Sequence, residues 1–438
     1  MMNKKEFKFK NKRILIYGFG ISGKASFIYL SNKNYVSIFD DNPRLIPQNY
    51  KKNYLDQKKV LKDSFDYIVV SPGINLNKCS LKNYLKKNKK KIISELDIFY
   101  LENKKNLKIT ITGTNGKSTT CKLLYEIIKN HKKDVRLVGN IGNPILLEKK
   151  INPKTIFIIE ASSYQIEYSS HFKTDIAAIL NITPDHLERH GTIIKYVKSK
   201  FKLIKNQQKG SIAFVDKKSK YLNSIIKKNK TYSKIINIKS SLSKNLKNKI
   251  RNNYFNNLNN LKNLQFIFEI SKKIKLNKNK IFETINSFKG LKYRQQIIFN
   301  NKKLQIINDS KSTSFASSLN LLQSYKNIYW IVGGKYKKGD KFTLEEKYFK
   351  NIKAYIIGSK TNFFKKEFKN KINHKTLNTI KKSLLKIIED VKNDKLKIVI
   401  LFSPSAASFD QFSNFEERGK FFDSILKKIN FIKKINAR

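Results

Sequence analysis

The sequence predicts an α/β protein built from about three domains, each around a parallel sheet. A chain of 438 residues is long enough for that number at about 150 residues per domain. Short apolar runs alternate with helical stretches along most of the chain. Several of these runs end in glycine-rich or small polar segments, which is typical of parallel strands whose carboxyl ends face a ligand.

The composition is that of a globular protein. Hydrophobic residues make up 40% of the chain and aromatic residues 12%, which excludes a disordered or fibrous protein. No apolar run approaches the roughly 18–20 residues that cross a bilayer. The basic stretch 1–13 has no apolar signal-peptide core. Cys79 and Cys121 are too few for a disulfide framework. We therefore expect a cytoplasmic protein.

The charge of the chain is strongly positive. There are 92 Lys and Arg residues against 32 Asp and Glu residues, a formal net charge of +60, which could indicate nucleic-acid binding. However, the lysines are spread along the whole chain and are enriched together with Asn and Ile, the residues that AT-rich codons favour. No zinc-ligand spacing or RNA-binding aromatic pattern accompanies them. We interpret the charge as genome composition and expect only non-specific attraction of polyanions at low salt.

A glycine-rich turn lies in the first third of the chain. Strands are expected there at 13–17, 35–39 and 65–70. The turn, Gly18-Phe19-Gly20-Ile21-Ser22-Gly23, joins the first strand to a helix at 24–30, and Asp40 ends the second strand. Glycines let a backbone approach a diphosphate, and a strand-end carboxylate suits a ribose hydroxyl. The pattern fits a nucleotide-type ligand, and equally a tight turn of any doubly wound domain. Ser71-Pro72-Gly73 could line the same crevice.

The strongest motif follows a strand expected at 107–112 and opens a helix. It reads Gly113-Thr114-Asn115-Gly116-Lys117-Ser118-Thr119-Thr120. Backbone N–H groups of such a loop wrap phosphates, while Lys117 can reach the terminal phosphates and Ser118 can ligate Mg²⁺. Ile111 stands where the common P-loop motif has its first glycine. The loop predicts an ATP site, the alternative being a glycine-rich turn with a chance Gly-Lys-Ser.

Polar residues follow two further strands of the same region, expected at 155–159 and 175–180. Glu160 ends the first strand, Asp185-His186 lies beyond the second, and Lys200 comes a helical turn or more later. A carboxylate beside a phosphate loop is where a metal that bridges phosphate oxygens would be held. His186 alone could equally be a structural histidine, and its place after Asp185 favours a functional one.

A last parallel sheet is expected near the end of the chain. Its strands are placed at 304–307, 328–332, 354–357 and 398–401. Small polar segments at 308–313 and 403–412 follow two of them, and the second continues into 415–419. With lysines nearby, these segments fit a small-anion site or ordinary loops. Before this sheet, 217–249 is interpreted as variable surface and 256–270 as a helix.

In order along the chain, these segments resemble the Mur ligases, ATP-dependent amino-acid ligases of peptidoglycan synthesis. The GTNGKST loop with Glu160 and Asp185-His186 looks like the central ATPase domain of that family. GFGISG, SPGI from Ser71, NDSKST from Asn308, and SPxxxSFDQFxNFExRG from Ser403 look like its D-glutamate-adding branch. The similarity spans essentially the whole chain, and the C-terminal motif is its most specific part.

The resemblance implies three domains and a reaction. It implies a Rossmann-like UDP-sugar domain (1–104), a central P-loop-type ATPase domain (105–291) and a Rossmann-like amino-acid domain (292–438). ATP, two Mg²⁺ ions, UDP-N-acetylmuramoyl-L-alanine and D-glutamate would be bound. ATP would phosphorylate the UDP-linked carboxylate, and the amine of D-glutamate would displace phosphate from the acyl phosphate. We expect a monomer with no membrane span and no specific nucleic-acid partner.

Motif matches carry the site residues of the family onto this chain. ATP would be bound by Gly113, Thr114, Asn115, Gly116, Lys117, Ser118, Thr119, Asn253, Asn256, Arg294 and Asp309. The UDP substrate would be bound by Gly18, Gly20, Ile21, Ser22, Asp40, Gly73, Asn140 and His186. D-Glutamate would be bound by Lys311, Thr313, Lys337, Ser408, Phe409 and Phe415.

The same resemblance implies the catalytic and metal-binding groups. Catalytic roles would fall to Lys117, His186, Lys200, Arg294 and Lys311. Metal ligands would be Ser118, Glu160, His186 and a carbamylated Lys200, because a carbamate gives magnesium the anionic oxygens that an ammonium lacks.

A few positions depart from the family pattern. Asn252 and Tyr293 stand where histidines are usual, and Ser405 stands where alanine is typical. Either Lys337 or Lys338 could be the lysine of the D-glutamate pocket. None of these departures removes a group that the mechanism needs, although the first two bear on the contacts to adenine.

Three other interpretations compete with this resemblance. Folylpolyglutamate synthase shares the ATPase logic but lacks an N-terminal glycine-turn domain of this kind. A basic P-loop protein that binds nucleic acid would have no use for the anion-site residues of the last domain. A degenerate, non-catalytic homologue would not be expected to retain Lys117, Glu160, His186, Lys200, Arg294, Asp309 and Lys311.

Overall fold

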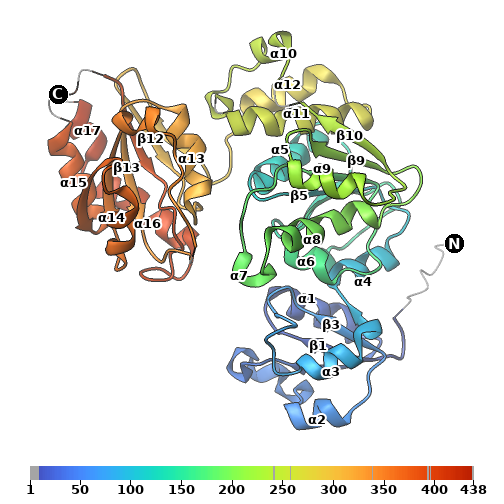
Figure 1. The fold of residues 1–438 in the computed structure, drawn as a ribbon. Coiled ribbons are helices and arrows are strands. Elements are labelled where there is room, and N and C mark those ends of the chain that lie inside the picture. Colours follow the sequence, from blue (N-terminus) through green and yellow to red (C-terminus); the bar gives the residue numbers. More distant parts are fainter. Residues whose placement is uncertain are drawn as a thin grey trace. The chain divides into compact units, whose positions relative to one another are not determined.

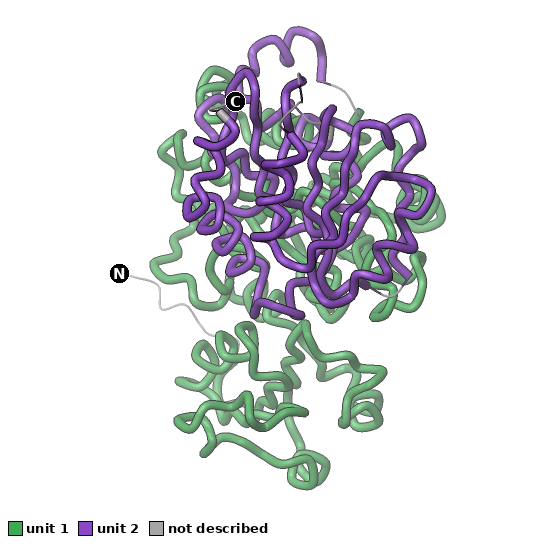
Figure 2. The backbone as a smooth tube through the Cα atoms, turned by 90° about the vertical axis from the view of Figure 1, so that its left-hand side faces the viewer, with its two compact units in different colours: residues 1–241, 263–284 green, residues 242–262, 285–438 purple. Residues whose placement is uncertain are grey.

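The chain divides into two compact units. The computed structural model describes residues 9–239, 242–256, 258–337, 339–391, 394 and 396–436. Unit 1 comprises residues 1–241 and 263–284, and unit 2 comprises residues 242–262 and 285–438 (Figure 2). The three domains expected at 1–104, 105–291 and 292–438 therefore stay a prediction. Among the described residues no helix is long and apolar enough to cross a membrane.

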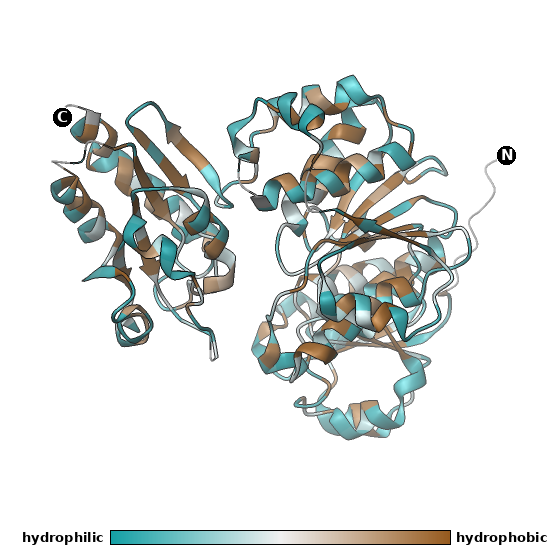
Figure 3. Cartoon of the chain, turned by 45° about the horizontal axis from the view of Figure 1, so that its top comes forward, coloured by the Kyte–Doolittle hydropathy of each residue, from teal (hydrophilic) through white to brown (hydrophobic). Residues whose placement is uncertain are grey.

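Three β-sheets form in the described part of the chain, two in unit 1 and one in unit 2 (Figure 1). All strand pairs but one are parallel within these sheets. The α/β fold class predicted from the sequence is confirmed. Central strands are almost entirely buried, because helices cover parallel sheets on both faces. These strands are mostly hydrophobic in sequence (Figure 3).

The first sheet of unit 1 has four strands in the order β2-β1-β3-β4. Its elements are β1 (Arg13–Tyr17), α1 (Ile21–Leu30), β2 (Tyr35–Phe39), α2 (Gln57–Lys62), β3 (Tyr67–Val70), α3 (Lys82–Lys87), β4 (Ile92–Ile93) and α4 (Glu95–Glu102). Tyr17 lies opposite both Phe39 and Val70. The three strands therefore end level, and the residues that follow them share one edge of the sheet.

The second sheet of unit 1 has six strands in the order β10-β9-β8-β5-β7-β6. The strands are β5 (Lys108–Thr112), β6 (Val135–Gly139), β7 (Ile156–Glu160), β8 (Ile176–Ile179), β9 (Ile212–Asp216) and β10 (Lys234–Ile238). The helices between them are α5 (Lys117–Asn130), α6 (Ser163–Tyr168), α7 (Leu187–His190), α8 (Ile193–Lys205) and α9 (Lys220–Lys227). Ile111 on β5 lies opposite Glu160 and Ala178 on the flanking strands, which brings the ends of all three strands together.

Unit 2 carries a six-stranded sheet in the order β11-β12-β16-β13-β14-β15. The strands are β11 (Gln296–Asn300), β12 (Leu304–Asn308), β13 (Ile328–Gly333), β14 (Ile352–Ile357), β15 (Asn373–Asn378) and β16 (Ile398–Phe402). Its helices are α13 (Phe315–Ser324), α14 (Thr361–Phe368), α15 (Ile380–Asp390), α16 (Phe415–Lys428) and α17 (Phe431–Asn436). The expectation of a wholly parallel sheet is wrong at β11, which pairs antiparallel with β12 across a short connection.

The segment expected to be variable surface is the main error of the sequence-based assignment. Residues 217–249 contain α9, β10 and α10 (Lys244–Asn248). The strand β10 is only partly buried, so its composition gave little sign of a sheet edge. The helix expected at 256–270 is α11 (Leu258–Lys273), and α12 (Lys278–Ser287) follows it.

Candidate active site

The phosphate loop of unit 1 is held in shape by the polypeptide that follows β8. Gly116 precedes α5 with a φ of +82°, a left-handed conformation that favours glycine. The N–H of Thr114 donates to the carbonyl of Asn181 at 3.0 Å. The side chain of Asn181 accepts from the N–H of Asn115 at 2.8 Å and donates to its carbonyl at 2.9 Å. Asn181 was not singled out from the sequence, although it opens the segment that contains Asp185 and His186.

The side chain of Lys117 folds back onto the phosphate loop that precedes it. Its Nζ donates to the carbonyls of Gly113 and Thr114, each at 2.8 Å. A terminal phosphate held by the loop amides would be a stronger, charged partner for the same ammonium. The ammonium thus lies beside the loop, and its predicted contact with a phosphate stays a prediction.

Glu160 ends β7 and is 1% exposed. Its Oε1 accepts a hydrogen bond of 2.9 Å from Nδ2 of Asn140. Its Oε2 is buried and has no hydrogen-bond partner among the described residues. Because a buried polar atom normally has a partner, this oxygen has the environment of a cation ligand. Asn140, assigned to the UDP substrate from the sequence, thus meets the candidate metal carboxylate.

Lys200 of α8 is buried against the start of the phosphate loop. Its Nζ donates to the carbonyl of Gly113 at 3.0 Å and to Oγ1 of Thr112 at 3.3 Å, and lies 4.7 Å from the centre of the Tyr196 ring. Burial lowers the pKa of Lys200 well below its usual value, and the positive charge of Lys117 lowers it further. The charged ammonium is therefore less favourable at this position than it is in water.

His186 lies beside two carboxylates at the start of α7. Its φ of +54° is left-handed. Nε2 is 3.4 Å from Oδ2 of Asp185, and Nδ1 is 3.6 Å from Oε1 of Glu188. His190, further along, is bonded through Nε2 to Oγ of Ser163 at 3.0 Å. Burial, with the nearby positive charges, lowers the pKa of His190 to about 4, so His190 acts as a neutral structural group.

The residues present fit a magnesium ion at the phosphate loop. The described residues contain no group of three or more His, Cys, Asp or Glu side chains that could hold a metal. The expected ligands include only two such side chains, Glu160 and His186. Magnesium is commonly held by one or two protein carboxylates with substrate phosphates and water. The unpaired Oε2 of Glu160 matches that pattern.

Hydrogen bonds with two side chains, Asp40 and Ser71, stabilise the glycine turn of the first sheet. Oδ2 of Asp40 accepts from the N–H of Phe19 at 2.7 Å, and its Oδ1 accepts from the N–H of Asn42 at 2.9 Å. Oγ of Ser71 donates to the carbonyl of Gly18 at 2.6 Å. Asp40 therefore holds the turn in this structure, and its expected contact with a ribose stays a prediction.

The outer side of this turn is open. Ile21 is 80% exposed. A methyl group added at Gly20 or Gly73 would meet no atom within 4 Å. The positions expected to contact the UDP substrate thus leave room at the carboxyl edge of the strands.

In unit 2, Asp309 directly follows β12 and is 5% exposed. Its Oδ2 accepts from Oγ of Ser403 at 2.8 Å, and its Oδ1 accepts from the N–H of Gln295 at 3.0 Å. Burial raises the pKa of Asp309 to about 7. The positive charge of Arg294, on the residue before Gln295, opposes this rise.

Phe415 brings together two cations expected to act in the reaction. Nζ of Lys311 lies 4.1 Å from the centre of the Phe415 ring, and the guanidinium carbon of Arg294 lies 5.5 Å from it. Arg418, three residues after Phe415, was not assigned a role from the sequence. It is buried, and its Nη2 donates to the carbonyls of Ser310 and Ala406 at 2.7 and 2.9 Å.

The remaining residues of unit 2 that were predicted to bind D-glutamate or ATP have fewer contacts with one another. The segment before Lys337 is tied to the segment before Ser408 by paired main-chain hydrogen bonds between Lys335 and Ala407. Phe409 is 69% exposed, and Thr313 is half-buried. Lys338 lies outside the described residues. Asn253 and Asn256 are both exposed, joined by a 3.1 Å side-chain hydrogen bond.

Comparison with known proteins decides the family. Residues 111–281 match the Mur ligase middle domain. UDP-N-acetylmuramoylalanine–D-glutamate ligase of Rickettsia prowazekii is 33% identical to this chain, in a match that covers 96% of this chain and 99% of that protein. This chain belongs to the Mur ligase family.

Further relatives agree with this assignment. The protein of the same name from Elusimicrobium minutum is also 33% identical, over 97% of this chain and all of that protein. Among solved structures, the MurF ligase of Thermotoga maritima, crystallised with ADP, covers 96% of both chains with a TM-score of 0.55 and 16% sequence identity. At that identity the likeness establishes the fold of a Mur ligase and nothing finer.

Proposed function

We propose that this chain is an ATP-dependent ligase that adds D-glutamate to UDP-N-acetylmuramoyl-L-alanine in the cytoplasm, as a step of peptidoglycan precursor synthesis. The structural observation that carries the proposal is a phosphate loop beside Glu160, whose buried Oε2 has no partner among the described residues. Full-length similarity to relatives named for this reaction gives the choice of amino acid and acceptor.

The chemistry proceeds through an acyl phosphate. An oxygen of the UDP-linked carboxylate attacks the γ-phosphorus of ATP, and ADP leaves. The amine of D-glutamate then attacks the carbonyl carbon, the amine loses a proton, and inorganic phosphate leaves as the amide forms. A free carboxylate is a poor electrophile, so the phosphoryl group supplies the leaving group. Charge on the transferring phosphoryl is stabilised by positioned cations.

Groups at the phosphate loop suit the first step. The loop amides and Lys117 would hold the phosphates of ATP, and Ser118 and Glu160 would hold one magnesium ion. When bound, magnesium would neutralise negative charge on the phosphates. A second ion would be held by His186 and by Lys200 as a carbamate.

Lys200 is suited to become a carbamate. Its amine is buried against the loop, where an ammonium is disfavoured. The nitrogen attacks the carbon of CO₂ and a proton leaves, which gives an anionic group with two oxygens. That group can ligate magnesium, whereas the amine and the ammonium offer no oxygen.

Unit 2 supplies groups for the second substrate and for the nucleotide. Lys311 and Arg294, both beside the Phe415 ring, provide positive charge for carboxylate or phosphoryl oxygens. Thr313, Lys337, Ser408 and Phe409 complete the proposed D-glutamate pocket. Asn253, Asn256 and Asp309 serve the nucleotide, and the protein acts as a monomer.

The test is phosphate release with ATP, Mg²⁺, UDP-N-acetylmuramoyl-L-alanine and D-glutamate, omitting each component in turn. Release should require all four and should be lost when L-glutamate or L-lysine replaces D-glutamate. With ¹⁸O in the acceptor carboxylate, one labelled oxygen should appear in the released phosphate, as an acyl phosphate requires. Release with ATP alone, stimulated by nucleic acid, would contradict the proposal.

A matched pair of lysine variants on α5 separates phosphate binding from general charge loss. Lys117→Met should reduce kcat/KM by at least about a hundredfold, since charge-assisted contacts to a transferring phosphoryl are worth several kcal/mol. Lys122→Met removes a charge on the same helix, where Lys122 pairs with Glu126 at 3.3 Å, and should change kcat/KM by less than about twofold. Equal losses in both variants would argue against the phosphate-loop assignment.

A further inference from the structure

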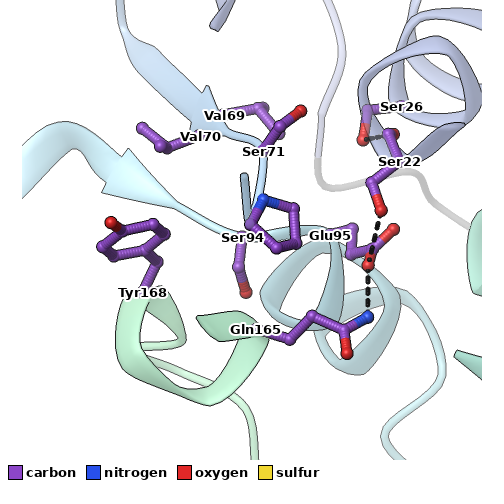
Figure 4. Close-up of a pocket in the computed structure, with 10 residues that line it drawn as sticks. Ser22, Ser26, Val69, Val70, Ser71, Ser94, Glu95, Gln165 and Tyr168 are labelled. Carbon is purple, nitrogen blue, oxygen red and sulfur yellow. Dashed lines mark hydrogen bonds between the residues drawn. The ribbon is translucent and has the colours of Figure 1, made fainter. Parts of the chain in front are cut away.

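A small cavity lined by both polar and apolar side chains lies behind the glycine turn, within unit 1. Its volume is about 10 Å³, and it is lined by residues of α1, β3, α4 and α6 (Figure 4). The side chains of Ser22, Glu95 and Gln165 face one another across it, joined by hydrogen bonds. This cluster therefore links the turn to elements that belong to the two sheets of unit 1.

Glu95 is the centre of the cluster. It is the first residue of α4 and is 5% exposed. Its Oε1 accepts from Oγ of Ser22 at 3.1 Å and from Nε2 of Gln165 at 2.8 Å. Burial raises the pKa of Glu95, and the described residues give it no ion pair. A buried carboxyl without a cation costs stability, and the two hydrogen bonds from Ser22 and Gln165 offset part of that cost.

Ser22 is the residue through which Glu95 reaches the turn. It lies in the first turn of α1, where its carbonyl also accepts from Oγ of Ser26 at 2.9 Å. The next residue, Gly23, packs so closely on the carbonyl of Gly18 that an added Cβ would lie 1.9 Å from that oxygen. Because the backbone is fixed on one side, the hydrogen bond to Glu95 fixes the remaining freedom of the Ser22 side chain.

Gln165 connects the same carboxyl to the second sheet. It forms a capping box with Ser162, in which Oε1 of Gln165 accepts from the N–H of Ser162 at 2.9 Å. Ser162 follows two residues after Glu160 at the end of β7. A continuous series of hydrogen bonds thus runs from the glycine turn through Glu95 to the loop that follows the candidate metal carboxylate.

We propose that Glu95 is a positioning residue that holds Ser22, and with it the glycine turn, in the form that binds the UDP substrate. This inference rests on the proposed function, in which the turn receives the UDP moiety. Glu95 acts through Ser22 and Gln165 and touches no substrate. Its removal therefore weakens binding of the UDP substrate and leaves nucleotide binding and the chemical step in place.

The test separates the KM for each substrate in Glu95→Ala and Glu95→Gln. Loss of a buried hydrogen-bond acceptor is expected to raise the KM for the UDP substrate about tenfold or more. The KM for ATP and kcat should stay within about twofold. Glu95→Gln keeps an acceptor oxygen for Ser22 and should restore most of the affinity. A Ser22→Ala, Glu95→Ala double variant should be no worse than the worse single variant, because both changes remove one interaction.

A neighbouring carboxylate provides the matched control. Asp97 lies on the same helix and is 0% exposed, but Oδ1 of Asp97 accepts from the main-chain N–H groups of His171 and Phe172 at 2.6 and 2.7 Å. Asp97→Asn should lower the melting temperature and leave the KM for the UDP substrate unchanged. Gln165→Leu, which breaks the series on its other side, provides a second variant if Glu95→Ala does not fold.

The outcomes separate this inference from the proposed function. Wild-type protein without ligase activity on the UDP substrate would contradict the proposed function, whatever the variants do. Active wild-type protein with an unchanged KM for the UDP substrate in both Glu95→Ala and Gln165→Leu would overturn the role of Glu95. An equal rise in the KM for ATP and for the UDP substrate would overturn it too, because a general loss of structure would explain both.

Discussion

Asn140 donates a 2.9 Å hydrogen bond from Nδ2 to Oε1 of Glu160. Glu160 is the last residue of β7, and Asn140 directly follows β6. The two residues lie close together because Gly139, the last residue of β6, lies opposite Glu160. The amide occupies one carboxylate oxygen and leaves Oε2 without a hydrogen-bond partner in the described part of the chain. Asn140 therefore fixes the orientation of the Glu160 carboxylate, as outer partners commonly do for metal ligands.

Asn140→Leu should weaken the response of the enzyme to magnesium. Without the amide, the Glu160 carboxylate loses its fixed orientation, and the Mg²⁺ concentration for half-maximal activity should rise about tenfold, the lower end of the effect of outer-partner changes. Titration of activity with Mg²⁺ at saturating ATP measures this. Asn143→Leu is the control, because the exposed Asn143 forms a similar 2.8 Å bond to Glu148, a carboxylate that is not a proposed metal ligand. An equal rise in the half-maximal Mg²⁺ concentration in both variants would contradict the role of Asn140.

Activity should depend on dissolved CO₂ through Lys200. Lys200→Arg should lose at least about a hundredfold in kcat, because a guanidinium stays charged and forms no carbamate. Wild-type activity should fall in CO₂-depleted buffer and return on addition of bicarbonate. Lys202→Arg, on the same helix with its Nζ bonded to the carbonyl of Glu167 at 2.9 Å, should remain active and keep the same CO₂ response. Full wild-type activity without CO₂ would rule the carbamate out.

Asp309 should make unit 2 less stable as pH rises. Burial raises its pKa from 3.8 to about 7, so the folded state binds this proton more tightly than the unfolded chain. The resulting stability is present below about pH 4 and is lost as pH rises through about 7. Trp330, the only tryptophan of the chain, is buried in the same unit and reports unfolding by its fluorescence. In urea titrations of the wild-type protein, the unfolding free energy should fall between about pH 4 and about pH 7. In Asp309→Asn this fall should be smaller. An unchanged slope would contradict the assignment to Asp309.

The sequence predicted the parts of the fold that are governed by local patterns. Strands such as β1, β12 and β16 are short buried runs that stop at glycine or small polar residues, so their ends could be placed from composition alone. β10 and β11 were missed because they are half-buried edge strands, whose pairing depends on neighbours distant in the chain.

The candidate site was predictable to the extent that motifs mark it. Lys117 and Lys200 both donate to the carbonyl of Gly113, and Glu160 lies opposite Ile111 on the neighbouring strand. The roles of these residues in ligand binding stay predictions. Asn263, which packs against Gly116, lies in an ordinary helical segment with no motif. Glu95 and Gln165 were also missed, because a buried hydrogen-bonded pair on two helices leaves no spacing signal in the sequence.

Gly116→Ala tests how tightly the loop is enclosed. Gly116 has a φ of +82°, and a Cβ added to it would lie 2.5 Å from Nδ2 of Asn263. Gly210 has a similar φ of +89° with no atom within 4 Å of an added Cβ, so Gly210→Ala measures backbone strain alone, on the order of 1–2 kcal/mol. Gly116→Ala should cost more than Gly210→Ala in unfolding free energy and should also weaken ATP binding. Adding Asn263→Ala removes the clash, so the double variant should recover the excess cost. If the double variant is no more stable than Gly116→Ala, Asn263 is not what encloses the loop.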